Sequence, residues 1–464
     1  MAGRKLPVIP ESGLAAPDNL QGSLDAEGRR HFVHPADVHG RFTRLRRVIF
    51  AVLIGIWIAL PSIRIHGVPL IQLDIVHRRF HLFGATFNAQ DIYLVFFLLT
   101  GLGFGLAAAT SLLGRVFCGY ACPQTVFLES FFRPIERLVE GPRAARLRLA
   151  AAPMSVGKFA RKALKHTLYI LAAFLTAHVF IAFFVPLPDV VRMVLSKPSA
   201  HPEAFGWAVA VTALVYGNFA FAREQVCLVV CPYGRLQSIL VDPDSVVIGY
   251  DKKRGEPRGK VHEEHVGDCV DCKRCVAVCP TGIDIRNGLQ LDCVGCAACV
   301  DACDEVMDKL QRPRGLVRYD SQNGLIGEKR RIWRPRLAIY AVLGLIGLTV
   351  ATITISRRTS FEANLLRSPG APFVLDGDTV RNTFVVHVVN KSDVAQEVVL
   401  TPAQSDLTFS PTEKTVLLEP NGDTRVMFVI TANREHKEVT FTVDVNSKVE
   451  KKTLRGQFVT PAGP

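Results

Sequence analysis

The stretch CVDCKRCVAVCP at residues 269–280 and its counterpart CVGCAACVDACD at residues 293–304 decide the organisation of this chain. Each is a C-x-x-C-x-x-C-x-x-x-C run, in which three thiolates bind one iron–sulfur cube and the fourth binds the cube of the other run. The doubled spacing therefore predicts two [4Fe–4S] clusters with crossed ligands. The first is expected on Cys269, Cys272, Cys275 and Cys303, and the second on Cys293, Cys296, Cys299 and Cys279.

The alternative for these cysteines is structural zinc. Zinc sites pair C-x-x-C units across a long spacer, so the doubled run favours iron–sulfur clusters. The runs differ after the fourth cysteine, where Pro280 follows the first run and Asp304 the second, which changes a turn and removes no ligand. Because no substrate pocket can be read beside these cysteines, the stretch predicts an electron relay.

The composition indicates a protein that lies partly in a membrane. The 464 residues are 49% hydrophobic and their mean hydropathy is +0.23, which is too apolar for an ordinary soluble protein. Five apolar runs approach the ~20 residues that cross a bilayer, at about 48–63, 91–113, 166–187, 204–222 and 336–355. They predict five transmembrane helices. Residues 1–40 are rich in Pro, Gly and charge, and are expected to form a flexible tail.

The distribution of positive charge predicts the orientation. The net charge is +13, but Lys and Arg lie beside the apolar runs, which indicates topology selection and not nucleic-acid binding. They are dense at 41–47, in the 114–165 loop and before the fifth run, and sparse at 188–203. Arg64, Arg78 and Arg79, after the first run, conflict mildly with this pattern. The amino terminus and residues 223–335 are therefore expected in the cytoplasm, and residues after 357 on the opposite side.

Residues after 357 form short runs of alternating apolar and polar residues with Asn, Gly, Pro and Asp between them. They predict β-strands at 382–390, 396–402, 414–420, 424–432 and 438–445, which suit a small β-sandwich. All twelve cysteines lie between Cys118 and Cys303, so this part offers no thiol. A binding or scaffolding role is expected for it instead of a catalytic one.

Four further cysteines form two C-x-x-x-C-P motifs, CGYACP at 118–123 and CLVVCP at 227–232. Each follows the expected cytoplasmic end of a helix, so the first four helices resemble a duplicated hairpin whose motifs meet near one membrane face. The prolines predict helix starts after Cys122 and Cys231, where lowered thiol pKa values and reactive thiols are expected. The identical spacing of the two motifs, on the same side as the relay, favours a functional role over small buried helix-end residues. Soft thiolates beside a low-potential donor favour Cu(I) binding or a redox disulfide over zinc, and a further cluster is less expected.

Two more stretches, RRFHLFGATFNAQD at 78–91 and YDKKRGEPRG at 250–259, complete a set of features that resembles one family. With the cysteine motifs and the β-sandwich, they are similar to the cytochrome c oxidase accessory proteins called CcoG, FixG or RdxA. The resemblance implies a bacterial inner-membrane polyferredoxin with a periplasmic immunoglobulin-like carboxy-terminal domain. It also implies a cupric reductase that converts Cu(II) to Cu(I) for assembly of the cbb-type oxidase. The suggested copper contacts correspond to Cys118, Cys122, Cys227 and Cys231.

The partners expected with this function are a cytoplasmic electron donor, a copper transporter or chaperone, and components of oxidase assembly. The rival is a polyferredoxin that conducts electrons between the quinol pool or a cytoplasmic donor and an anaerobic respiratory reductase. The expected domains are the tail at 1–40, four transmembrane helices at 41–222, the cytoplasmic two-cluster ferredoxin-like module at 223–335, the fifth helix at 336–356 and the β-sandwich at 357–464.

Overall fold

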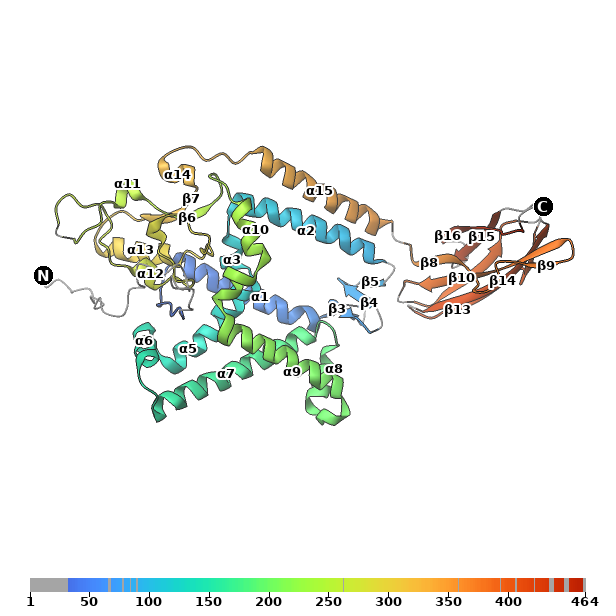
Figure 1. The fold of residues 1–464 in the computed structure, drawn as a ribbon, viewed down its shortest axis with the longest axis horizontal. Coiled ribbons are helices and arrows are strands. Elements are labelled where there is room, and N and C mark those ends of the chain that lie inside the picture. Colours follow the sequence, from blue (N-terminus) through green and yellow to red (C-terminus); the bar gives the residue numbers. More distant parts are fainter. Residues whose placement is uncertain are drawn as a thin grey trace. The chain divides into compact units, whose positions relative to one another are not determined.

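The computed structural model describes residues 32–461 except for short segments at 66–67, 77–78, 84, 89–90, 262, 358, 393, 405–406, 421, 434–437 and 446–449. Most of the expected flexible tail, residues 1–31, lies outside the described residues. The chain divides into two compact units, one of Met1–Gln72 with Leu98–Leu348 and the other of Leu73–Phe97 with Thr349–Pro464. Figure 1 labels many of the helices and strands of both units.

Five helices among the described residues are long and apolar enough to cross a membrane, which confirms the five predicted spans. They are α1 (Arg41–Ser62), α2 (Ile92–Leu113), α7 (Val156–Ile181), α9 (Pro202–Gly217) with its π-helical continuation η4 (Asn218–Ala222), and α15 (Pro335–Ser356). In Figure 1, α2 and α15 run side by side. Glycines allow this approach, because a Cβ on Gly101 would lie 3.4 Å from the backbone nitrogen of Leu348.

The third span begins earlier than its apolar run predicts. Helix α7 starts at Val156, where the Ser155 hydroxyl accepts a hydrogen bond from the Lys158 amide at 3.2 Å. Its polar first turns carry Lys162 and Lys165, which pair with Glu140 at 2.8 and 3.0 Å. These ion pairs stabilise a polar first part of α7 that precedes its apolar, membrane-spanning part. The segments α8 (Leu187–Leu195) and η3 (Pro198–Ala200) then lead to α9.

Short helices surround each C-x-x-x-C-P motif. The first group is α3 (Val116–Tyr120), α4 (Pro123–Phe127), the π turn η2 (Leu128–Phe132), α5 (Arg133–Glu140) and α6 (Arg143–Ala151), and the second is η5 (Val226–Val230) and α10 (Pro232–Leu240). A buried aromatic cluster fixes η2 against α7 and η4. In it Phe132 stacks on Phe219 at 4.4 Å and meets Tyr169 edge-on at 5.0 Å. The amphipathic segment predicted after Pro123 is therefore helical, with a π turn inside it.

The doubled cysteine run lies in a compact module between α10 and α15. Its elements are β6 (Val247–Tyr250), α11 (Lys252–Gly255), α12 (Arg274–Ala277), η6 (Ile285–Asn287), α13 (Ala298–Lys309), β7 (Val317–Asp320) and α14 (Gln322–Ile326), with β6 and β7 antiparallel.

The module is attached to the first membrane helix. The Asp301 carboxylate of α13 accepts hydrogen bonds from the amides of Phe42 and Thr43 at 3.2 and 2.7 Å. It thus satisfies amides that the amino terminus of α1 leaves free. Gly40 permits the contact, because a Cβ there would lie 2.2 Å from the Asp301 carboxyl carbon.

The second unit contains a two-sheet β-sandwich, as predicted. One sheet has the order β12–β14–β10–β8 with β9 paired to β10, and the other has the order β13–β11–β15–β16. The strands are β8 (Phe361–Arg367), β9 (Val374–Asp376), β10 (Thr379–Asn390), β11 (Gln396–Pro402), β12 (Thr408–Ser410), β13 (Lys414–Leu418), β14 (Asp423–Asn433), β15 (Glu438–Val445) and β16 (Glu450–Gln457). Phe361, Phe428 and Phe441 lie in the core between the sheets.

Short strands also follow α1. They are β1 (Arg64–Ile65), β2 (Val68–Pro69), β3 (Ile71–Asp74), β4 (Arg79–Leu82) and β5 (Ala85–Asn88). Beyond them, Asp91 is buried just before α2, and the Lys391 ammonium lies 2.7 Å from it and 2.9 Å from Glu362 of β8. This buried cation therefore holds together two carboxylates from distant parts of the chain.

Candidate iron–sulfur and thiol sites

Four cysteines of the doubled run line one small cavity. They are three from the first run and the last from the second, namely Cys269, Cys272, Cys275 and Cys303. Tyr250 of β6 and Val317 of β7 form part of the same wall. The strand pair thus closes one side of the cavity, and the thiols come from the segment just before α12, from α12 and from α13.

The other four cysteines line a second cavity. They are Cys279, Cys293, Cys296 and Cys299, and Cys275 of the first set also borders this cavity. The two groups contain the same residues that the crossed spacing assigns to two clusters. Among the described His, Cys, Asp and Glu side chains, no three converge closely enough to hold a single metal ion. A cube binds its four thiolates at separate corners, so this spacing is compatible with a cluster, whereas a single ion at any group of cysteines in the described part of the chain requires the side chains to move toward it.

The two cysteine runs share one backbone conformation. In each run the residues before and after the second cysteine are left-handed, with φ of 48° and 53° at Asp271 and Lys273 and of 66° and 57° at Gly295 and Ala297. Left-handed turns of this kind direct successive amides to one side. The amide of Arg274 faces the Cys272 sulfur, and the amide of Ala298 faces the Cys296 sulfur in the same way. Amides near the sulfurs stabilise negative charge on a bound cluster.

Burial controls the protonation of these thiols. It raises the pKa of Cys293 and of Cys303 to about 12, and it raises the pKa of Cys299 well above the usual thiol value. The thiols of Cys293, Cys299 and Cys303 are therefore protonated at neutral pH until a cation binds them, and binding releases protons. Eight soft donors in two groups of four, of which Cys269, Cys275 and Cys296 are buried, fit two [4Fe–4S] clusters, whose chemistry is one-electron transfer.

The structure also brings together the thiols of the two C-x-x-x-C-P motifs. Cys118 lies in α3, Cys122 and Cys231 are the residues before α4 and α10, and Cys227 lies in η5. The Cys227 thiol lies within electrostatic range of the other three thiols. The thiols of Cys122 and Cys231 also lie within electrostatic range of each other. These four cysteines are called the thiol quartet below.

The reactive thiol predicted at the first helix start, Cys122, is not supported by its surroundings. Two amides, of Gln124 and Thr125, lower the pKa of Cys122, but burial outweighs them and the net shift is upward. Burial also raises the pKa of Cys118, and it raises the pKa of Cys227 to about 12. The prediction of a lowered pKa at Cys122 is therefore wrong, because the helix-end effect is local and burial is stronger.

Two residues that the sequence did not single out hold Cys118. The Cys118 thiol donates to the side-chain oxygen of Gln237 at 3.3 Å, and Arg115 donates to the same oxygen at 2.8 Å. Gln237 is fully buried. No spacing rule points to a glutamine in a short helix, so no sequence signal was available for it.

The thiol quartet lies directly against the second cysteine set. A Cβ on Gly119, next to Cys118, would lie 2.8 Å from the Cα of Cys296 and 2.8 Å from the carbonyl oxygen of Gly295. Cys118 and Cys296 also share one buried apolar cluster. The three thiol sets therefore follow one another in the order quartet, second set and first set, with Cys275 between the last two.

A buried charge network fixes the two halves of the quartet. Glu136 of α5 accepts two hydrogen bonds from the Arg223 guanidinium, at 3.0 and 3.1 Å. The side-chain amides of Gln124 and Asn218 exchange hydrogen bonds at 3.0 and 2.8 Å. Gln124 follows the first motif, whereas Asn218 and Arg223 precede the second. The network therefore joins the segments that carry Cys122 and Cys227.

Comparisons with known proteins match all three parts of the chain. Residues 222–322 match a 4Fe-4S dicluster domain, residues 94–142 a 4Fe-4S binding domain, and residues 351–461 the IG-like fold at the C-terminal of FixG. Protein RdxB of Cereibacter sphaeroides is 37% identical over 420 residues, covering 86% of this chain and 87% of RdxB. Nitrogen fixation protein FixG of Rhizobium meliloti is 35% identical and covers 78% of this chain and 77% of FixG. Protein RdxA of Cereibacter sphaeroides is 36% identical, covering 78% and 80%.

Five apolar helices, two 4Fe–4S domains and an immunoglobulin-like sandwich define a multi-pass membrane iron–sulfur protein of electron transfer. The chain belongs to the FixG/RdxA family. The family resemblance inferred from the cysteine motifs is thereby confirmed.

Proposed function

We propose that this chain reduces Cu(II) to Cu(I) at the thiol quartet during assembly of a cbb-type cytochrome c oxidase. The observation that supports the proposal is the meeting of four soft thiols against the backbone of Cys296. Thiolate ligands favour Cu(I) over Cu(II), so binding at Cys118, Cys122, Cys227 and Cys231 makes the reduction of copper more favourable.

The cluster ligands in this proposal are the two groups of cysteines that line the two cavities. Cys269, Cys272, Cys275 and Cys303 hold one [4Fe–4S] cluster, and Cys279, Cys293, Cys296 and Cys299 hold the other. A cytoplasmic donor supplies the electrons. A copper transporter or chaperone and the oxidase assembly components are the expected partners for the copper.

The charge balance distinguishes two routes of reduction. In the relay route each Cu(II) accepts one electron from the donor, and the protonated thiols of Cys118, Cys122 and Cys227 release protons as they bind the ion. In the dithiol route two Cu(II) ions accept two electrons while Cys118 and Cys122, or Cys227 and Cys231, form a disulfide and release two protons. Only the second route proceeds for one round without clusters.

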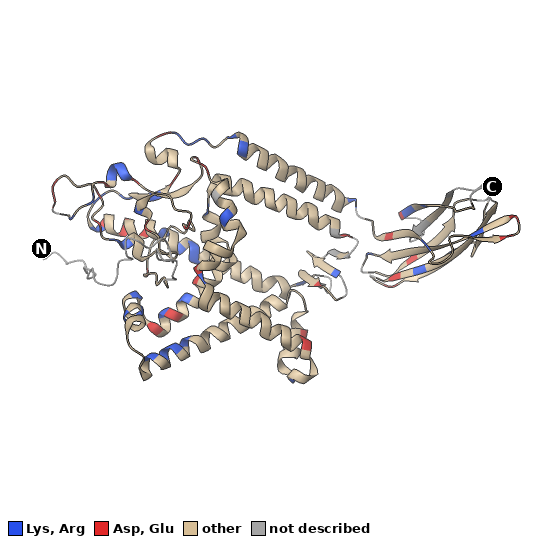
Figure 2. Ribbon diagram, viewed as in Figure 1, with Lys and Arg blue, Asp and Glu red and all other residues tan. Residues whose placement is uncertain are grey.

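The orientation in the proposal follows the positive charges. Figure 2 shows Lys and Arg at the start of α7 and just before α15, and few charged residues along the spans. Positive residues mark the cytoplasmic side. Residues 32–40, the 114–165 loop and the 223–335 module are therefore assigned to the cytoplasm of a bacterial inner membrane, and the 357–464 sandwich to the periplasm. A reporter that is active only outside the cytoplasm is expected to be active when fused after residue 200 and inactive when fused near 310.

A second candidate is an electron conduit to an anaerobic respiratory reductase. The match of residues 94–142 to a 4Fe-4S binding domain favours it, because that segment contains Cys118 and Cys122. In this candidate the thiol quartet holds a further cluster and copper is no substrate. Iron and sulfide analysis of anaerobically purified protein separates the candidates, since about eight irons per chain are expected for two [4Fe–4S] clusters and about twelve for three.

The decisive test is a Cu(I)-chelator colour assay on dithionite-reduced, desalted protein. The wild type is compared with Cys269→Ser/Cys293→Ser, which removes ligands of both clusters, and with Cys122→Ser/Cys231→Ser, which halves the quartet. The relay route predicts that the first variant loses reduction but still binds Cu(I). If the second variant retains full reduction and binding, the quartet is not the copper site and the respiratory conduit becomes the better proposal.

A further inference from the structure

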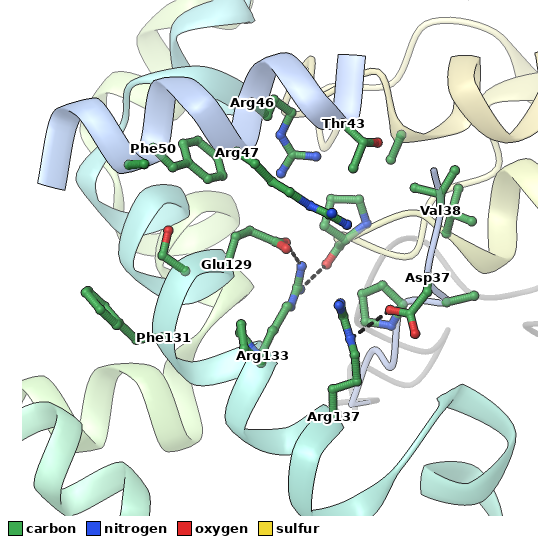
Figure 3. Close-up of a pocket in the computed structure, with 18 of the residues that line it drawn as sticks. Asp37, Val38, Thr43, Arg46, Arg47, Phe50, Glu129, Phe131, Arg133 and Arg137 are labelled. Carbon is green, nitrogen blue, oxygen red and sulfur yellow. Dashed lines mark hydrogen bonds and ion pairs between the residues drawn. The ribbon is translucent and has the colours of Figure 1, made fainter. Parts of the chain in front are cut away.

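A cavity of about 430 Å³ lies beside the second cysteine set, between the start of α1, the extended residues 35–38 and the helices η2 and α5. Figure 3 shows Arg47, Arg133 and Arg137 extending from these segments toward the middle of the cavity. Val278 and Pro280, on either side of Cys279, form part of its wall. All these segments belong to the first unit.

Positive charge predominates in the cavity wall. Its five arginines are Arg46, Arg47, Arg133, Arg137 and Arg146, whereas its acidic residues are Asp37 and Glu129. Three of the arginines have partners. Arg133 pairs with Glu129, Arg137 lies 2.7 Å from Asp37, and Arg146 lies 3.6 Å from Glu136. The remaining two, from α1, give the cavity an excess of cationic side chains.

Arg46 and Arg47 form no ion pair within the described part of the chain. Arg46 is only 7% exposed, its guanidinium lies 5.3 Å from the ring centroid of Phe50, and its Nε has no hydrogen-bond partner among the described residues. Figure 3 shows Arg47 extending into the cavity. Arg46 lies within electrostatic range of Glu129, but that carboxylate is already ion-paired with Arg133, so an anion beside Arg46 and Arg47 would balance the excess positive charge.

The other side of the cavity is apolar. Phe50, Ala51 and Ile54 follow the arginines along α1, and Phe131 faces them from η2. The cavity thus combines guanidinium groups at the end of a membrane helix with an apolar surface on the same helix. A phosphate attached to acyl chains matches both parts, whereas a free phosphate matches only the first.

We propose that this cavity binds the phosphate of an anionic phospholipid, with Arg46 and Arg47 as its counter-charges and the apolar residues of α1 against an acyl chain. Arginine is suited to this task because its planar guanidinium donates two hydrogen bonds to one phosphate. The Arg133 guanidinium also donates to the carbonyl oxygen of Pro280 at 2.9 Å. The bound lipid would therefore touch the segment that carries Cys279, so membrane composition and the second cysteine set are coupled.

The test uses full-length protein in phosphatidylcholine nanodiscs that contain phosphatidylglycerol, with bound lipid measured by native mass spectrometry after detergent release. The variant is Arg46→Gln/Arg47→Gln. The matched control is Arg41→Gln/Arg44→Gln, which removes the same charge from the same helix but alters no residue of the cavity wall. A second arm adds inorganic phosphate and adenosine monophosphate as soluble competitors.

We expect phosphatidylglycerol to be retained by the wild type and by the control. Its affinity is expected to fall roughly 25-fold in the cavity variant, from about a fivefold loss for each arginine near the surface. Soluble phosphates are expected not to displace it. Equal retention in both double variants would overturn the site. Displacement by adenosine monophosphate or phosphate would overturn the lipid as its ligand and identify a soluble phosphate compound instead.

Discussion

Replacement of Glu136 by glutamine is predicted to lower the free energy of unfolding of the first unit by about 3–5 kcal/mol, the range for removing one partner of a buried ion pair. Glu136 and Arg223 are each 1% exposed. Glutamine preserves the volume of the side chain but removes its charge. The Arg223 guanidinium is then left in the interior without its two charge-assisted hydrogen bonds.

The neighbours of Glu136 place the expected cost at the lower end of that range. Arg223 keeps Glu224 at 3.8 Å, and Lys165 keeps Glu140 at 3.0 Å. Arg146 still donates to the Pro35 carbonyl at 2.7 Å. We therefore expect about 3 kcal/mol, and a recovery of part of it in the double variant Glu136→Gln/Arg223→Gln, which removes both charges.

The assay is denaturant unfolding of the detergent-solubilised protein, followed by alkylation of Cys227 as a local probe. The matched control is Asp37→Asn, which removes the partner of Arg137 in an exposed pair whose side chains are 35% and 43% exposed. The control is expected to cost less than about 1 kcal/mol. A Glu136→Gln variant no less stable than Asp37→Asn, with Cys227 equally protected, would refute the assigned role of the buried network.

Three further outcomes are expected. Gly119→Ala should lower the free energy of unfolding by about 1–3 kcal/mol, because its Cβ would overpack against Cys296. It should also slow the reduction of copper while the iron content is retained. The control Gly217→Ala, whose Cβ would meet nothing within 4 Å, should change neither the stability nor the reduction of copper. Burial lowers the pKa of His34 to about 4, below its unfolded value of ~6.5. The contribution of neutral His34 to stability is therefore present above pH ~6.5 and is lost as the pH falls toward 4. His34→Gln should flatten the dependence of Tm on pH in that window. Lys391→Met should lower the unfolding temperature of the carboxy-terminal unit, because two carboxylates lose their shared cation, and a Tm equal to that of wild type would contradict this.

The sequence predicted those features that depend on local pattern. The five spans follow from composition, and the sandwich follows from alternating runs such as 382–390 inside β10. The grouping of Cys303 with the first run follows from a spacing rule, and its role as a ligand stays a prediction. Strand β16 was not predicted because its sequence, EKKTLRGQ, is largely polar. It lies at the edge of its sheet, next to β15, where a polar strand is tolerated.

The remaining features depend on contacts between distant segments. The Gly119 contact with Cys296 and the pairing of Glu136 with Arg223 join residues that no local pattern connects. The raised pKa of Cys122 has the same origin. The start of the helix after Cys122 can be predicted from the proline that follows this residue. The burial of the Cys122 thiol, which outweighs the effect of the helix-end amides on its pKa, depends on the folded chain.

The hydrogen bonds of Asp301 have a consequence for biogenesis. Asp301 lies between Cys299 and Cys303, and it closes the first turn of α1 at Thr43, 258 residues earlier in the chain. Metal binding contributes folding free energy to the segment that carries the ligands. If these cysteines bind iron as proposed, we expect the amino-terminal turn of α1 to be completed only after the last cysteine run has bound it. We expect a chain starved of iron to present a frayed segment to proteases at the membrane surface, so that iron supply sets how much of the protein accumulates.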